Sequence, residues 1–143
     1  MSAIIQASRV RKAALPFIST WRTSNISEGS SNALQVSLPL YSDGIYDFEV
    51  NWGDGTSSKI TNANLENAIH SYETEGTYIV TMRGALAGFR FSDAGDKLKL
   101  LSIEQWGCLR IGNLGNIFMG CSNLNIPNVT DILNLEGVTN LDY

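Results

Sequence analysis

The sequence predicts an all-β protein in which a small β-sandwich follows a short N-terminal arm and precedes a segment built of repeats. Six or seven short segments, spaced about ten residues apart, alternate apolar and polar residues as strands with one buried face do. Turn residues such as glycine, aspartate and asparagine separate these segments. Beyond residue 92 leucines and asparagines recur instead, and aromatic residues become fewer.

The composition is that of a folded protein with a weakly charged surface. The 143 residues are enough for one domain of ordinary size or two small ones. Hydrophobic residues make up 43% of the chain and charged residues 17%, which is below the usual share of about a quarter. A polar surface with few charges is typical of extracellular and virion β-proteins.

Residues 1–15 form a basic arm ahead of an acidic body. Arg9, Arg11, Lys12 and Arg22 all precede the first acidic residue, Glu28. The rest of the chain has six basic and fourteen acidic residues. We expect these four basic residues to dock on an acidic protein partner, although a solvated tail would have the same composition. The acidic body argues against nucleic-acid binding.

The sequence predicts neither a secretion leader nor a membrane span. The apolar run Ala13-Ala14-Leu15 is stopped by Pro16, so no leader of sufficient length forms. No run approaches the ~18 apolar residues that a membrane helix requires.

Strands are predicted from the alternating pattern along residues 16–92. We expect a loop over 24–32, a turn over 39–44 and a loop or single helical turn over 62–67. Residues 83–88 predict a connection punctuated by glycine. The predicted strands span 17–23, 33–38, 46–52, 56–60, 76–82 and 89–91, with 69–72 leading into the fifth.

A change of composition at residues 92–96 predicts a domain boundary. We therefore divide the chain into an arm (1–15), a sandwich (16–92) and a repeat segment (93–143). Asn113-Leu114 returns as Asn140-Leu141 after 27 residues, within the range of about 20–29 residues for leucine-rich repeats. Repeats of this kind stack their leucines inward.

The sandwich segment resembles the PKD domain, an immunoglobulin-like β-sandwich. The turn Trp52-Gly53-Asp54-Gly55 follows a strand, and glycine and aspartate at these positions suit a tight hairpin. His70-Ser71-Tyr72 and then Gly76-Thr77-Tyr78 complete the resemblance. It implies a structural role for these residues, with Trp52 in the core.

The segment after residue 92 resembles the BspA-type leucine-rich repeat of bacterial surface proteins. The informative motif is Phe118-Met119-Gly120-Cys121-Ser122-Asn123-Leu124, and the resemblance as a whole covers residues 16–143. It implies display and adhesion rather than catalysis. A solenoid normally needs at least about three repeats, so a partner or further repeats would have to cover the open end.

These observations favour a non-enzymatic structural protein. We expect a bacteriophage virion protein of the capsid or tail, of the decoration or fibre type, that contacts other subunits or copies of itself. The alternative is a bacterial cell-surface adhesion module that binds a host surface protein or glycan. The third interpretation is a carbohydrate-binding or hydrolytic accessory module.

Few residues carry chemistry. We interpret His70, the single histidine, as structural, because no nucleophile motif accompanies it. Cys108 and Cys121 lack the paired spacing of a zinc site, and a disulfide between them is left open. No cofactor is expected; calcium is left open through Asp43, Asp47, Asp54, Asp93 and Asp96. Ligand contacts are predicted at Tyr41, Tyr46, Trp106 and Tyr143.

Overall fold

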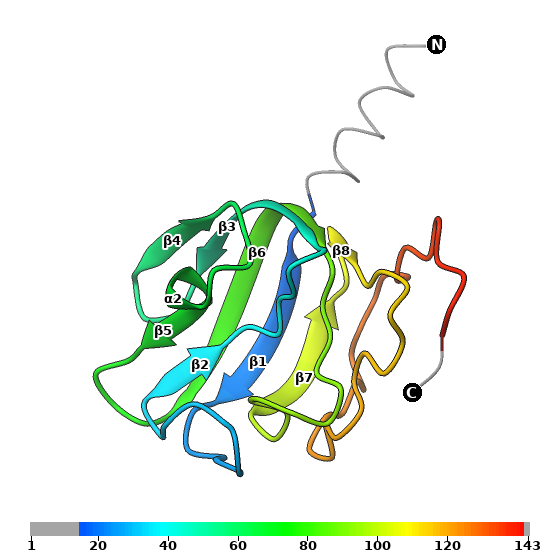
Figure 1. Cartoon of the computed structure of the whole chain (residues 1–143). Helices are drawn as coiled ribbons and strands as arrows, with labels where there is room; N and C mark the ends of the chain where they lie inside the picture. Colours follow the sequence, from blue (N-terminus) through cyan, green and yellow to red (C-terminus); the bar gives the residue numbers. More distant parts are fainter. Residues whose placement is uncertain (1–14, 142–143) are drawn as a thin grey trace.

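The computed structural model describes residues 15–141, which form an almost entirely β structure (Figure 1). Arg9, Arg11, Lys12 and Tyr143 lie outside the described residues. The elements are β1 (Phe17–Arg22), β2 (Gln35–Ser37), β3 (Ile45–Asn51), β4 (Ser57–Ile60), α2 (Leu65–Ala68), β5 (Ile69–Ser71), β6 (Thr77–Ala87), β7 (Leu100–Gln105) and β8 (Leu109–Arg110).

The main sheet has the strand order β4-β3-β6-β1-β7, and every pair along this path is antiparallel. Strand β8 pairs with β6 in parallel. The antiparallel pair β2-β5 lies over one face of the main sheet (Figure 1). The predicted all-β class is therefore confirmed, and the two sheets are consistent with a β-sandwich.

The core lies between these layers because the strands alternate as predicted. In β3 the side chains of Tyr46, Phe48 and Val50 are buried, while those between them are exposed. Trp21 of β1 and Val36 of β2 are fully buried in the same cluster. Burial of large apolar side chains of this kind contributes roughly 1.5–3 kcal/mol each to folding.

Two predicted segments differ in the structure. The connection predicted over residues 83–88 is mostly strand, because β6 continues to Ala87 and its residues 81–87 pair with β3. Gly84 permits this continuation, since a Cβ at this position would lie 2.4 Å from the Asp47 carbonyl oxygen. The strand predicted over 89–91 is absent. Phe89 and Phe91 are instead buried in the core from irregular backbone.

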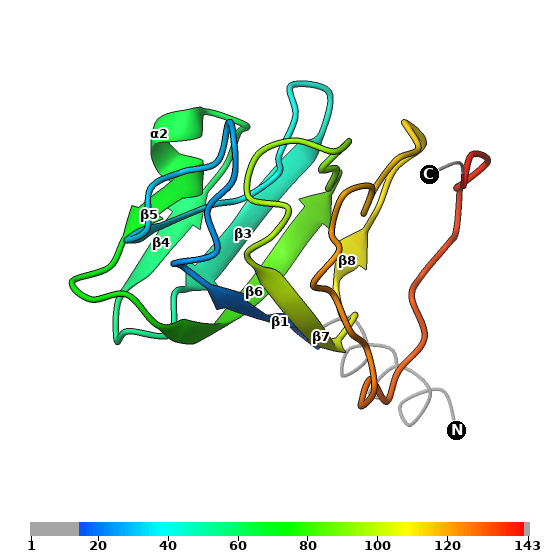
Figure 2. The same ribbon diagram turned by 90° about the horizontal axis from the view of Figure 1, so that it is seen from below.

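The sheet continues past the expected boundary between residues 92 and 93. Strand β7 pairs with β1, so the segment after residue 93 completes the main sheet. Leu100, Ile103 and Leu109 are buried in the same cluster as the sandwich residues. Figures 1 and 2 show the chain beyond residue 120 running alongside β7 and β8. The sandwich and the start of the repeat segment thus share one core.

Candidate functional site

The Trp-Gly-Asp-Gly turn packs against His70. The imidazole of His70 is stacked on the Trp52 indole, with centroids 4.7 Å apart and an interplanar angle of 7°. Its Nε2 lies 2.8 Å from Asp54 Oδ2. Asp54 Oδ1 accepts hydrogen bonds from the backbone N–H and the hydroxyl of Thr56 (3.0 and 2.5 Å). The Asp54 carboxylate therefore fixes the turn by bonding Thr56 through one oxygen and His70 through the other.

This cluster lacks the geometry of a nucleophile-histidine-acid relay. In such a relay the acid and the nucleophile lie on opposite ring nitrogens of the histidine. Here both Asp54 and the Thr56 hydroxyl approach the same His70 nitrogen, at 2.8 and 3.4 Å. The arrangement holds a turn and leaves no activated hydroxyl.

The other residues of the PKD-like motif extend the same cluster. The Tyr72 hydroxyl donates to the Trp52 carbonyl (2.7 Å), and the Tyr72 ring stacks on Tyr78 at 3.9 Å. Burial raises the pKa of Tyr72. The Gly76 carbonyl accepts the Thr23 N–H (2.9 Å), and the Gly76 N–H donates to the Thr23 hydroxyl (3.0 Å). Positive φ angles at Gly53 and Gly55 form the hairpin. The motif residues therefore lie together, as their sequence pattern suggested.

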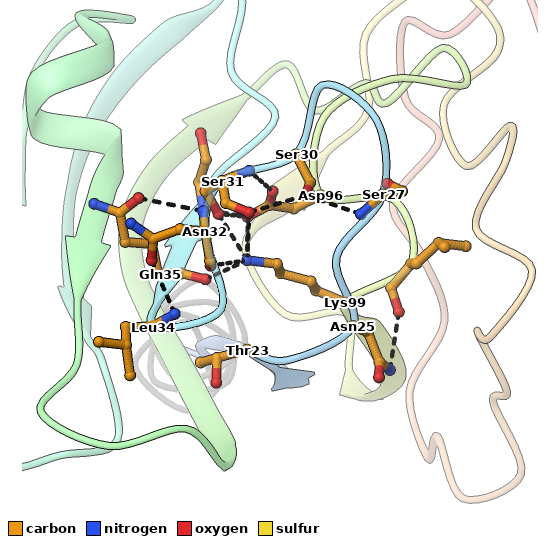
Figure 3. Close-up of polar contacts among 12 residues, drawn as sticks. Thr23, Asn25, Ser27, Ser30, Ser31, Asn32, Leu34, Gln35, Asp96 and Lys99 are labelled. Carbon is orange, nitrogen blue, oxygen red and sulfur yellow. Dashed lines mark hydrogen bonds and ion pairs between the residues drawn. The ribbon is translucent and has the colours of Figure 1, made fainter.

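A second polar cluster lies deeper, around Lys99 and Asp96 (Figure 3). Both side chains have no exposed surface, and Lys99 Nζ lies 3.8 Å from Asp96 Oδ2. The ammonium donates to the carbonyls of Asn32 (2.6 Å) and Gln35 (2.7 Å) and to the carbonyl and hydroxyl of Ser31 (3.2 and 2.8 Å). The Lys99 ammonium thus contacts four oxygen acceptors between residues 31 and 35.

The Asp96 carboxylate gathers donors from the same loop. It accepts the Ser31 N–H (2.7 Å), the Ser31 hydroxyl (2.6 Å) and the Ser37 N–H (2.6 Å). Burial lowers the pKa of Lys99, and the charge of Asp96 opposes that shift. Because every charged atom has partners, the pair fastens β2 and the loop that precedes it to the start of β7.

Sequence reasoning missed this pair. Lys99 stands between Leu98 and Leu100, and in a regular strand a residue flanked by leucines points outward. Lys99 instead lies just before β7 begins, where the backbone is irregular, so Lys99 and Leu100 are both buried. The one sign in the sequence was that apolar and polar residues do not alternate strictly over residues 98–101.

Beyond β7 the chain stacks on itself in parallel. The backbone N–H of Asn125 donates to the Leu101 carbonyl (2.9 Å), and Ser102 and Asn125 form a parallel bridge. The Asp131 carboxylate accepts the N–H groups of Trp106 and Gly107, both at 2.8 Å. Each contact joins residues 23–25 apart in the sequence.

The predicted Asn-Leu repeat lies in this stack. The Asn113 side chain donates to the Gly137 carbonyl and accepts from the N–H groups of Thr139 and Asn140. The Asn140 amide donates back to the Asn113 carbonyl (3.2 Å). The two asparagines therefore join consecutive turns of the chain.

The apolar residues of the stack repeat every 24 residues. Leu109, Ile111 and Ile117 are 0%, 4% and 3% exposed. Leu133, Leu135 and Leu141 follow them at this interval; Leu133 is half-buried, while Leu135 and Leu141 are 44% and 54% exposed. The turn that contains residues 133–141 thus has apolar residues at the same positions as the turn that contains residues 109–117, but their side chains are more exposed.

The BspA-like motif residues lie at the junction of the two parts. The Phe118 ring packs between the rings of Phe91 and Trp106, at 6.4 and 6.2 Å. Gly120 has a positive φ of 89° and lies against Asp93. Leu124 and Cys121 are half-buried against the core, and burial raises the pKa of the Cys121 thiol to about 12. Cys108 and Cys121 are both free thiols.

The residues predicted to contact a ligand differ in exposure. The prediction for Tyr46 is wrong, because the alternation of β3 points its side chain inward and leaves it 6% exposed. Its hydroxyl donates to the Gly88 carbonyl (2.8 Å). Trp106 is half-buried against the core beside Phe118. Tyr41 is half-buried and lines a surface hollow of about 400 Å³. Arg22 is exposed at the end of β1.

The five aspartates considered for calcium are spread over the surface and core. Four of them lie beside a cationic or imidazole partner: Asp47 beside Lys59, Asp54 beside His70, Asp93 beside Lys97 and Asp96 beside Lys99. Within residues 15–141 no group of three histidine, cysteine or acidic side chains is gathered as a metal site would require.

Comparisons of the chain with models of protein families, with curated proteins and with solved structures found no match. Among residues 15–141, no helix has the length and apolar character needed to cross a membrane.

We expect replacement of Lys99 by methionine to destabilise the protein strongly. The substitution preserves much of the volume but leaves the Asp96 carboxylate buried without its cation, which costs about 3–5 kcal/mol. Chemical denaturation measures the loss. The double variant Lys99→Met/Asp96→Asn is the matched control and should recover part of it. Equal stability of Lys99→Met and the unmodified chain would contradict the assigned role.

We expect Asp54 to make stability depend on pH in the acid range. Desolvation opposes ionisation, but hydrogen bonds from Thr56 and His70 outweigh it and hold the pKa of Asp54 below its ordinary value. A carboxylate with a lowered folded-state pKa stabilises the fold above its unfolded pKa of about 3.9. This stabilisation disappears as the pH falls through the folded-state value.

The measurement is thermal unfolding of Asp54→Asn and of the unmodified chain between pH 2 and 6. The variant should be less stable at pH 5–6, and the difference should shrink below about pH 4. Asp43→Asn, at an exposed carboxylate in a turn, is the control and should leave the pH profile unchanged. Parallel profiles for Asp54→Asn and the unmodified chain would exclude the proposed linkage.

Proposed function

We propose that this chain is a non-enzymatic structural and display protein of a bacteriophage virion, of the capsid or tail decoration or fibre type. In this proposal the PKD-like sandwich is a rigid body, and the stacked turns are the start of a leucine-rich-repeat solenoid. The basic residues 1–15 dock on an acidic subunit of the particle. Partners are other protein subunits, and adhesion to a host surface is a further role of the exposed repeat face.

The observation that carries the proposal is the apolar surface of the last turn. Ile111 and Ile117 are buried, whereas Leu135 and Leu141, which follow them by 24 residues, are 44% and 54% exposed. Exposed apolar side chains in a row are typical of surfaces that contact another protein. This pattern favours an assembly or adhesion module over an enzyme.

The second candidate is a bacterial cell-surface adhesion module of the BspA type. The same open turn and the BspA-like motif around Cys121 support it, since this repeat occurs in surface proteins. The two candidates differ in setting rather than in the surface used. The basic arm favours the virion, because a particle assembled from acidic subunits offers it a docking site.

The test is the presence of the chain in purified phage particles from the culture that produces it. We expect mass spectrometry to find the chain in gradient-purified particles. Deletion of residues 1–14 should abolish incorporation, while the circular dichroism of the remaining chain stays unchanged. Arg83→Ala is the control, since Arg83 is an exposed arginine of β6 and is not one of the proposed docking residues. A monomeric chain that is absent from particles would contradict the virion proposal.

A matched pair of variants separates the repeat face from the core. Leu135→Asp alters an exposed position and should change unfolding free energy by no more than about 1 kcal/mol, yet weaken partner binding. Ile111→Asp, placed 24 residues earlier and 4% exposed, should prevent folding. Full partner binding by Leu135→Asp would exclude the last turn as the contact surface.

A further inference from the structure

A surface hollow lies where the sandwich meets the stacked turns. Its volume is about 400 Å³, which falls within the range of about 300–1,000 Å³ for small-molecule sites. The sandwich contributes Tyr41, Asp43 and Ile45 to its lining, and the stack contributes residues 112–114 and 136–138. We call this feature the junction hollow. Junctions between two parts of a fold are common places for ligand sites.

Hydrogen bonds fix the backbone on both sides of the junction hollow. The Tyr41 N–H donates to the Tyr46 hydroxyl (3.1 Å), and the Tyr41 carbonyl accepts the Gly44 N–H (3.0 Å). On the side of the stack, the Asn113 amide donates to the Gly137 carbonyl (2.9 Å). The lining is therefore formed before a ligand arrives, so little ordering of the chain would oppose binding.

Two glycines place the Tyr41 ring. A Cβ on Gly112 would lie 2.3 Å from the Tyr41 hydroxyl oxygen, and a Cβ on Gly88 would lie 2.9 Å from it. Within residues 15–141 this hydroxyl makes no hydrogen bond, and it is not one of the buried polar atoms that lack a partner. Burial raises the pKa of Tyr41, so the hydroxyl keeps its proton at neutral pH. It is therefore a donor that a ligand in the hollow can reach.

The charged side chains of the hollow have few internal contacts. In the described part of the chain, the exposed Asp43 carboxylate makes neither a hydrogen bond nor an ion pair. Arg110 lies 3.6 Å from Glu136, and these side chains are 43% and 82% exposed. So long and exposed an ion pair is weak, and it leaves guanidinium N–H groups available to a ligand.

The lining combines apolar side chains with hydrogen-bonding groups of both kinds. Ile45 and Leu114 are 70% and 47% exposed, and both line the hollow. A saccharide ring has an apolar C–H face and an edge of hydroxyl groups that donate and accept, so it matches such a lining. Two carboxylates and one guanidinium give the lining a net charge of −1, which disfavours phosphate, sulfate or a sialic acid.

We propose that the junction hollow binds a neutral saccharide. The Tyr41 hydroxyl and the Arg110 guanidinium donate to its oxygens, the Asp43 carboxylate accepts from its hydroxyl groups, and Ile45 and Leu114 contact its C–H face. This inference rests on the adhesion role in the proposed function and names the ligand class for it. The site is separate from the contact surface at Leu135, which does not line the hollow.

A glycan array probed with the purified full chain, followed by calorimetric titration of the best ligand, tests the proposal. The array holds neutral oligosaccharides and their sialylated and sulfated counterparts. We expect a neutral member to bind more tightly than its anionic counterparts. Asp43→Asn should weaken its binding about tenfold, because a hydrogen bond to a charged acceptor is lost.

Tyr41→Phe should weaken binding several-fold, because it removes only the hydroxyl and keeps the ring. Since this hydroxyl makes no internal hydrogen bond, the thermal unfolding midpoint should not change, which separates lost binding from lost folding. Asp47→Asn is the matched control for Asp43→Asn. It alters an exposed aspartate of β3 that does not line the hollow, and it should bind the saccharide as the unmodified chain does.

Three results would overturn the inference. The first is that no neutral saccharide binds at millimolar concentration, and the second is that the anionic counterparts bind more tightly. The third is equal affinity of Asp43→Asn, Tyr41→Phe and the unmodified chain. A chain that is present in particles but binds no saccharide would contradict this inference alone. A chain that binds a saccharide but is absent from particles would contradict the virion proposal alone.

Discussion

The buried ion pair between Lys99 and Asp96 is the constraint on which the rest of the structure depends. A buried charge is tolerated only when hydrogen bonds and an opposite charge replace its water. Both side chains meet this condition through β2 and the loop that precedes it. The pair lies where the chain enters β7. It therefore fixes the strand that closes the main sheet beside β1 and on which the next turn stacks.

The second organising element is the packed turn around Trp52 and His70, at the other end of the sheet. There an exposed hairpin is held by the stacking of His70 on Trp52 and by the Asp54 carboxylate. The sandwich is thus stiffened at both ends, by one cluster in the hairpin and by one at the junction. A stiff body that carries exposed apolar side chains such as Leu135 is suited to the display role that we propose.

Alternation in the sequence predicted the strands that have one buried face, such as β1 and β3, to within two residues. It failed where glycine or irregular backbone breaks the rule. Gly84 suggested a connection although β6 continues through it, and Phe89 and Phe91 alternate like a strand but are buried from a loop. The Asn-Leu pairs, which predicted leucine-rich repeats, contact each other through Asn113 and Asn140. Their interval of 27 residues differs from the apolar interval of 24, because Leu114 is 47% exposed and is not one of the inward residues. Lys99 could not be recognised, since burial of a lysine depends on acceptors 64–68 residues away.

The central claim is that the sandwich core continues into the stacked turns after β7, and that the burial of apolar side chains decreases toward residue 141. Hydrogen exchange of backbone amides measures this directly, because protection reports the free energy of local opening. We predict slow exchange in β7 and at Trp106, Gly107 and Asn125, whose N–H groups bond across the stack, and progressively faster exchange from residue 129 to 141. Rapid exchange at Trp106, Gly107 and Asn125 together, with protection confined to the sheet, would contradict the account.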